Sequence, residues 1–274
     1  MIDFLNKLQD DSLNSHSIVH IGDSHIQADF FTGKLRKLFQ HEYGNAGRGL
    51  VFPYAFAKTN GHSDAKFHAN NCIWSNLKIV KAKEYDALGI PAIQLQLISN
   101  STCGFQLKFK DDSSEISKGF TELELITKGD ARISLTDMEG SSLLMIKDTL
   151  IQDLKHQTFI SNYPIELVNF SLDKTSIEFE LKGILLKKNK PGVYYHSIGV
   201  NGAEFSDYIQ QENFFKELSV LKPELIVVSL GTNESVSNID SITFYNYLNS
   251  FYTQILPYKA ALLFTCPSDN DRRK

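Results

Sequence analysis

The spacing of apolar residues divides the chain into two kinds of sequence. From residue 62 to residue 190, apolar residues alternate with polar ones, and Gly, Asp, Ser or Asn recur between the alternating segments. Short strands about every ten residues are typical of an antiparallel β-sandwich. Over residues 1–61 and 191–274, apolar residues recur at helical spacing or in short unbroken runs, as in a parallel sheet covered by helices. We therefore predict a discontinuous α/β domain, 1–61 plus 191–274, with an all-β sandwich inserted into it.

A short strand, a polar turn and a helix stand near the start of the chain. The segment Ser17–Gly22 is rich in β-branched residues, which favours a buried strand. His20 lies within it, and we expect a hydrogen-bonded core residue there. Asp29 is a candidate N-cap for a helix that runs to about Gln40. Its expected buried face comprises Phe31, Leu35, Leu38 and Phe39, and its expected exposed face Lys34, Arg36 and Lys37. The glycine-rich loop that follows, YGNAGRG, is more typical of a helix C-cap than of a phosphate cradle.

Three predicted strands end in short polar turns: GDSH at residues 22–25, GVNGA at 199–203 and GTNES at 231–235. In a parallel sheet the carboxyl ends of the strands share one edge, so the three turns can converge. The Ser24 hydroxyl can attack a carbonyl carbon. The N–H groups of Ser24 and Gly202 and the side-chain amide of Asn233 can donate to the oxyanion that forms, each worth ~3–4 kcal/mol. The pattern predicts acyl transfer, with these three residues as the catalytic set.

Four further residues are candidates for substrate binding: Asp23, His25, Arg48 and Asn201. For three of them a simpler interpretation is available. A lone Gly-Asp-Ser triplet is common in loops, and an Asp before a serine often caps the turn that it begins. A histidine next to a serine points away from the hydroxyl in most backbone geometries. For Arg48, only its position in a loop favours a place in the cleft.

These blocks resemble the SGNH (GDSL-like) hydrolases. His25 after the serine, the YGNAGRG loop and a β-module between the first two blocks resemble the peptidoglycan O-acetylesterase branch in particular. The resemblance implies a flavodoxin-like, three-layer α/β fold with a parallel sheet, and a carbohydrate-binding-like role for the β-sandwich. It also implies removal of O-acetyl groups from cell-wall glycan, in the periplasm or cell envelope.

The sequence departs from that family in its last block, Asp-x-x-His, which supplies the catalytic base. No histidine follows His196, so nothing after Asn233 fits this block. We therefore expect the chain to be truncated, with a missing C-terminal segment that completes the site. A general base is worth ~10²–10⁴-fold, so this chain alone is expected to be weak or inactive. Two alternatives stay open: an O-acetylesterase for another polysaccharide, and a glycan-binding protein with an incomplete catalytic set.

Composition excludes several other classes. The 274 residues carry a net charge of −4 with no basic run before the last four, which argues against a nucleic-acid partner. No apolar run reaches the roughly 18–20 residues of a membrane span, and Met1 begins no signal peptide.

No cysteine or histidine pair has the spacing of metal ligands, and we expect neither metal nor cofactor. We expect Cys72 and Cys103 to be buried free thiols, with a disulfide as the alternative in an exported protein.

Overall fold

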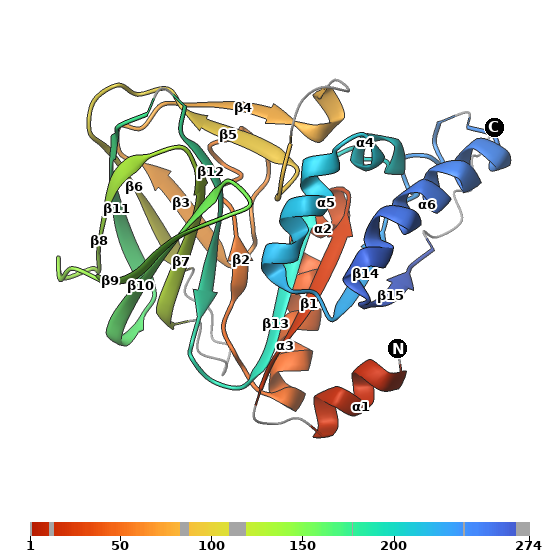
Figure 1. Cartoon of the computed structure of the whole chain (residues 1–274), viewed down its shortest axis with the longest axis horizontal. Helices are drawn as coiled ribbons and strands as arrows, with labels where there is room; N and C mark the ends of the chain where they lie inside the picture. Colours follow the sequence, from red (N-terminus) through yellow and green to blue (C-terminus); the bar gives the residue numbers. More distant parts are fainter. Residues whose placement is uncertain are drawn as a thin grey trace.

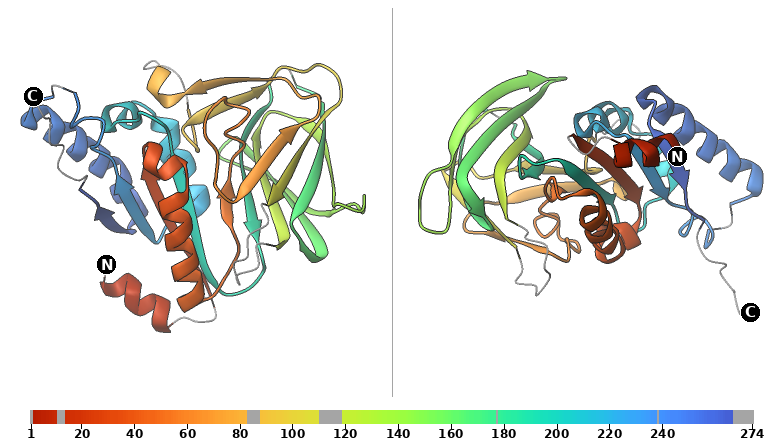
Figure 2. Two further views of the ribbon diagram at one scale, coloured as in Figure 1. Left: turned by 180° about the vertical axis from the view of Figure 1, so that it is seen from behind. Right: turned by 90° about the horizontal axis from the view of Figure 1, so that it is seen from below.

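The computed structural model of the chain describes residues 2–10, 14–82, 88–109, 119–176, 178–237 and 239–266. Within these residues the strands form three sheets, one parallel and two antiparallel (Figure 1). Figure 2 shows the antiparallel sheets packed together on one side of the molecule and the parallel sheet with its helices on the other.

The parallel sheet has four strands in the order β13-β1-β14-β15. Their bounds are Gly192–Gly199 for β13, Ser15–Gly22 for β1, Leu225–Ser229 for β14 and Ala261–Phe264 for β15. Successive side chains of β1 point to opposite faces of the sheet. Ile18 packs in one apolar cluster with residues of α1 (Ile2–Asp10) and α3 (Phe30–Tyr43). Val19 and Ile21 pack in another cluster with α4 (Phe205–Ile209), α5 (Glu212–Leu218) and α6 (Ser241–Ile255). Helices therefore cover both faces.

The larger antiparallel sheet has seven strands: β4 (Trp74–Lys78), β5 (Ile93–Leu97), β12 (Glu180–Lys187), β7 (Phe120–Lys128), β10 (Leu154–Ile165) and β9 (Leu144–Ile151) in that order, with β2 (Gly49–Val51) on β12. The smaller one has the order β3 (Ala65–Ala69), β6 (Cys103–Phe109), β11 (Leu167–Lys174) and β8 (Ala131–Thr136). Residues of both sheets, such as Leu125 and Leu107, share one hydrophobic core. Their alternating patterns arise because each strand turns every second side chain toward that core.

The prediction of a flavodoxin-like α/β fold is wrong. Most of the strands lie in the two antiparallel sheets, and only the four-stranded sheet is parallel, so the structure is mostly β. The cause is the extent of the alternating sequence, which supplies far more strands than the α/β segments do. Strand β2, which precedes residue 62, pairs with β12 at Val51–Ile184. The division into domains 1–61 plus 191–274 and 62–190 stays a prediction.

The face of α3 that points inward agrees with the prediction only in part: Leu35 and Phe39 pack against the apolar cluster of Ile18, and Lys34 and Lys37 are exposed, as expected. Phe31 and Leu38 are more than half exposed, whereas Thr32, Arg36 and Gln40 are buried. These three residues recur every four positions, so they form one stripe on the helix. The inward stripe is polar because it meets polar partners from β13 and the loop before β2, such as the Val193 carbonyl that accepts from Gln40 Nε2 at 3.0 Å. The expected helix C-cap is confirmed at Gly44. Its φ of 94° is a conformation that glycine adopts readily and other residues rarely do.

Cys72 and Cys103 form a disulfide bond, so the expectation of two free thiols is wrong. Both residues are buried, and their Cα atoms lie 5.0 Å apart, within the usual range for a disulfide. Local hydrogen bonds hold the two segments side by side: Asn70 N donates to the Gly104 carbonyl, and Gly104 N donates to Asn71 Oδ1. The bond ties the loop after β3 to the start of β6.

Candidate active site at the edge of the parallel sheet

The three predicted catalytic turns leave the parallel sheet side by side. Gly22, at the end of β1, is in register with Gly199 of β13 and with Ser229 of β14. Because β1 lies between the other two strands, the Ser24 turn is central and the other two turns flank it. The expectation that the three strand ends share one edge is confirmed. The catalytic roles of Ser24, Gly202 and Asn233 stay predictions.

Ser24 is an exposed residue that opens the four-residue helix α2 (Ser24–Gln27). The buried Asp23 is the N-cap of α2, and its Oδ1 accepts from the backbone N–H of His25 at 2.9 Å. The same oxygen lies 3.0 Å from His25 Nδ1, while the His25 ring is 70% exposed. Within the described part of the chain, no side chain hydrogen-bonds the Ser24 hydroxyl. The structure therefore presents Ser24 to solvent beside an Asp23–His25 pair.

The second turn is anchored through Gln27 of α2. Asn201 N donates to Gln27 Oε1 at 2.7 Å, and the Asn201 side-chain amide donates to Thr59 Oγ1 at 3.2 Å. These bonds hold Asn201 between α2 and the loop after β2. Gly202 follows with a φ of +81°, and a Cβ there would come within 4 Å only of Val80 Cγ1, at 3.9 Å. The main chain at Gly202 is therefore open to the approach of a ligand.

Asn233 links the third turn to the second. Its Nδ2 donates to the Ala203 carbonyl at 2.9 Å. A primary amide has two N–H donors, so this bond leaves one for another acceptor. The neighbouring Glu234 is buried, and its Oε1 accepts from Phe205 N at 2.6 Å. The structure therefore brings the GVNGA and GTNES blocks into direct contact at the start of α4.

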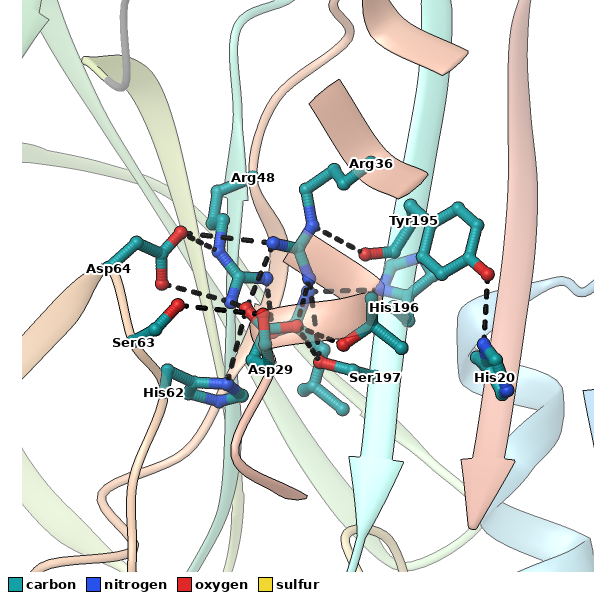
Figure 3. Close-up of polar contacts among 12 residues, drawn as sticks. His20, Asp29, Arg36, Arg48, His62, Ser63, Asp64, Tyr195, His196 and Ser197 are labelled. Carbon is teal, nitrogen blue, oxygen red and sulfur yellow. Dashed lines mark hydrogen bonds and ion pairs between the residues drawn. The ribbon is translucent and has the colours of Figure 1, made fainter. Parts of the chain in front are cut away.

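A buried ionic network supports the Ser24 turn (Figure 3). Asp29 follows α2, and its carboxylate accepts from Arg36 Nη2 at 2.8 Å and from Arg48 Nη2 at 2.7 Å. Arg48 also donates through Nε to Asp64 Oδ2 at 2.6 Å. Ser197 of β13 donates to Asp29 Oδ1 at 2.9 Å. One carboxylate thus joins α3, the parallel sheet and the β-rich part of the chain.

Arg48 is 5% exposed, and its guanidinium group donates hydrogen bonds to Asp29 and Asp64 inside this network. These contacts favour a structural role for Arg48 over the substrate contact that its loop position suggested. Burial alone would raise the pKa of Asp29, but Arg36 and Arg48 hold it well below its usual range. Burial and the charge of Arg48 lower the pKa of His62 to about 4. The network is therefore a pair of guanidinium groups against the ionised Asp29 and Asp64. No sequence motif pointed to it, because its members are scattered over the chain.

His20 lies in the centre of the parallel sheet, as expected for a hydrogen-bonded core residue. Its Nδ1 is 2.9 Å from the Tyr195 hydroxyl, and its Nε2 is 2.6 Å from Ser229 Oγ. Ser229 Oγ in turn lies 2.7 Å from Thr265 Oγ1. Burial lowers the pKa of His20 to about 4, so the ring is neutral at pH 7. This chain of polar contacts ties three parallel strands together.

Within the described residues, no group of three or more His, Cys, Asp or Glu side chains is arranged to hold a metal ion. None of the helices described is long and apolar enough to cross a membrane.

This chain resembles known proteins in its fold more than in its sequence. No protein-family model and no curated protein matches it. A solved structure of a peptidoglycan O-acetylesterase aligns with 96% of this chain and 70% of that chain, with a TM-score of 0.70 and 22% identity. A family 29 carbohydrate-binding module with mannohexaose aligns with 57% of this chain and 94% of that chain, at a TM-score of 0.31 and 12% identity. The expected resemblance to the peptidoglycan O-acetylesterases is thus confirmed at the level of the fold.

Proposed function

We propose that this protein is a serine carboxylesterase that removes O-acetyl groups from cell-wall glycan, with Ser24 as the nucleophile. The proposal rests mainly on the strand register, in which Gly22 is paired with Gly199 and with Ser229. This register places the exposed Ser24 between two turns that contain hydrogen-bond donors. The likeness of the fold to a peptidoglycan O-acetylesterase supports the choice of substrate.

In the proposed reaction, Ser24 Oγ attacks the carbonyl carbon of an acetyl ester, and the carbonyl oxygen becomes an oxyanion. The N–H groups of Ser24 and Gly202 and the second N–H of the Asn233 amide stabilise this oxyanion. The bond between the carbonyl carbon and the sugar oxygen then breaks. The sugar oxygen takes up the proton that Ser24 has lost, and the acetyl group stays on Ser24. Water then releases acetate and restores the serine. The open main chain at Gly202 leaves room for the acetyl oxygen.

The transfer of the Ser24 proton decides the rate. No histidine of the described residues hydrogen-bonds Ser24, and a general base is worth ~10²–10⁴-fold. We therefore expect slow acetate release compared with an esterase that holds a complete Ser-His pair.

We also propose that the protein works in the periplasm or cell envelope. The Cys72–Cys103 disulfide supports this location, because disulfides persist mainly in oxidising compartments. O-acetylated cell-wall glycan lies in the same compartment.

The test is acetate release from O-acetylated peptidoglycan and from acetylated xylan by the native chain and by Ser24→Ala. Ser206→Ala is the matched control, because Ser206 lies in α4 beside the same sheet edge. We expect release from peptidoglycan that is lost in Ser24→Ala and kept in Ser206→Ala. Release that survives Ser24→Ala would overturn the proposal, and faster release from xylan would assign another polysaccharide as substrate.

A non-catalytic glycan-binding protein is the second candidate, favoured by the lack of a histidine bonded to Ser24 among the described residues. It predicts that O-acetylated glycan binds equally to the native chain and to Ser24→Ala, with no acetate released by either.

A further inference from the structure

A cavity lies at the other end of the parallel sheet from Ser24. It has a volume of about 670 Å³, and Ser15 and Ser17, at the amino end of β1, line it. Strand β1 rises about 3.3 Å per residue, so its amino end lies roughly 20 Å from the Ser24 turn. We call this cavity the rear cleft. Cavities of this size between packed units are typical places for small ligands.

One wall of the rear cleft is the outward face of the seven-stranded sheet (β12, β7, β10 and β9 in Figure 1). Polar side chains cross this face from strand to strand. Lys187 of β12 donates to Glu122 at 3.1 Å and to Glu124 at 2.5 Å, both on β7. Glu124 Oε1 lies 2.7 Å from Nδ1 of His156 on β10, and His156 is paired with Thr149 of β9. The wall is therefore a fixed row of donors and acceptors.

The opposite wall combines aromatic and apolar side chains with polar ones, among them Ser17, Lys222 and Glu224. Tyr194 and His196 of β13 lie side by side, with ring centroids 6.0 Å apart. The 3₁₀ helix η2 (Ser219–Leu221) adds Val220 and Leu221. Ser219 Oγ donates to Gln152 Oε1 at 3.3 Å, which joins η2 to the tip of the β9–β10 hairpin and fixes the two walls to each other.

The charges in the rear cleft balance. Three acidic residues, Glu122, Glu124 and Glu224, line it together with three lysines, Lys147, Lys187 and Lys222. Burial alone would raise the pKa of Glu124, but hydrogen bonds and charge from His156 and Lys187 bring it to about 2, so this carboxylate is ionised. Because the ions neutralise one another, the cleft selects neither an anion nor a cation. It suits an uncharged polar ligand.

Two buried polar atoms of the lining residues have no hydrogen-bond partner in the described part of the chain. They are Nε2 of His156, a residue only 3% exposed, and Oγ1 of Thr149. A buried polar group without a hydrogen-bond partner destabilises the folded state by about 1–3 kcal/mol, so most such groups in native proteins are hydrogen-bonded. Both residues belong to the polar wall.

We propose that the rear cleft binds a neutral oligosaccharide. A pyranose has an apolar ring face and a rim of uncharged hydroxyls, which matches Tyr194 and Val220 on one wall and the carboxylates, Lys187 and Thr149 on the other. The volume suits a short oligosaccharide rather than one sugar ring. The proposal does not rest on the esterase activity, since the cleft is separate from Ser24.

The test is calorimetric titration of Ser24→Ala, in which catalysis cannot contribute, with tetra-N-acetylchitotetraose, cellotetraose and mannotetraose, each up to millimolar concentration. Tetragalacturonate serves as the charged comparison. Thr149→Val, added to this background, removes the cleft hydroxyl at nearly constant shape. Thr127→Val is the matched control, because Thr127 lies on the same sheet with an equally unpartnered buried hydroxyl but does not line the cleft.

We expect at least one neutral tetrasaccharide to bind, and to bind more tightly than tetragalacturonate. Thr149→Val should weaken binding about fivefold and Thr127→Val should not change it. Tyr194→Ala should weaken it about tenfold. Binding that Thr149→Val leaves unchanged, or tighter binding of tetragalacturonate, would overturn the proposal, as would no binding of any neutral probe. Acetate release by the native chain does not enter these outcomes, so the two proposals fail separately.

Discussion

The side-chain amide of Asn233 donates a hydrogen bond to the backbone carbonyl of Ala203 at 2.9 Å. This contact joins the turn after β14 to the turn after β13, across the end of β1 that carries Ser24. The position of Gly202, next to Ala203, therefore depends on a side chain that lies 30 residues further along the chain.

Asn233→Ala should lower acetate release about 10²–10³-fold, because it removes one oxyanion donor and the tie that positions Gly202. The measurement is kcat on O-acetylated peptidoglycan, with thermal unfolding alongside. Asn249→Ala, on the exposed side of α6, is the control and should not change kcat. Equal loss in both variants would contradict the role given to Asn233.

Gly202→Ala separates crowding of the site from loss of stability. Its φ of +81° costs an alanine roughly 1–2 kcal/mol of backbone strain, while the added Cβ finds open space. Gly140 is a matched control with a φ of +85° and no atom within 4 Å of an added Cβ. Both variants should lose similar stability in denaturant unfolding. Only Gly202→Ala should also slow acetate release, by roughly tenfold or more, because its methyl group meets the substrate.

Asp29→Asn should destabilise the protein by about 3–5 kcal/mol at pH 7, because two buried guanidinium groups would then share the single carboxylate of Asp64. The control is Asp173→Asn, whose side chain is 43% exposed and which should change stability by less than about 0.5 kcal/mol.

The same residue predicts a pH dependence. The pKa of Asp29 is lower in the folded state than in the unfolded state, so the unfolded chain binds its proton first as the pH falls. The stabilisation is complete above about pH 5 and is lost progressively below it. The free energy of unfolding should therefore fall less steeply from pH 5 to pH 2 in Asp29→Asn than in the native chain. Parallel slopes would contradict the assignment.

The disulfide predicts a thiol count. The folded chain should react with one equivalent of a thiol reagent without reductant, at the exposed Cys266. After reduction and unfolding, all three cysteines should react. Because the bond closes a loop over a separation of 31 residues, reduction should lower stability by about 3–4 kcal/mol. Three reactive thiols in the unreduced protein would contradict the bond.

Local patterns in the sequence predicted single elements well. Strand β1 and the turn at Gly22 follow from β-branched residues and a strand breaker, and the register confirms that the three strand ends share one edge. The fold class was wrong because periodicity identifies strands but does not say how much of the fold they make up. On the predicted exposed face of α3 only Arg36 was misplaced, because a pattern of hydrophobic residues places every charged side chain outside.

Long-range partners were the part that the sequence could not show. The polar stripe of α3 is buried because Asp29, Ser197 and the Val193 carbonyl meet it, and Val193 and Ser197 lie more than 150 residues further along the chain. Cys72 and Cys103 carry no spacing signal, so their pairing needed the structure. The catalytic roles of Ser24, Gly202 and Asn233 were proposed from motifs and still await measurement.

The role of Ser24 as nucleophile is tested by the intact mass of the protein after long treatment with a serine-directed fluorophosphonate, followed by peptide mapping. Labelling counts modified molecules rather than turnovers, so it detects a slow nucleophile. We predict one adduct on the peptide that contains Ser24, and none in Ser24→Ala. An adduct that persists in Ser24→Ala, or a native chain that stays unlabelled, would contradict Ser24 as the nucleophile.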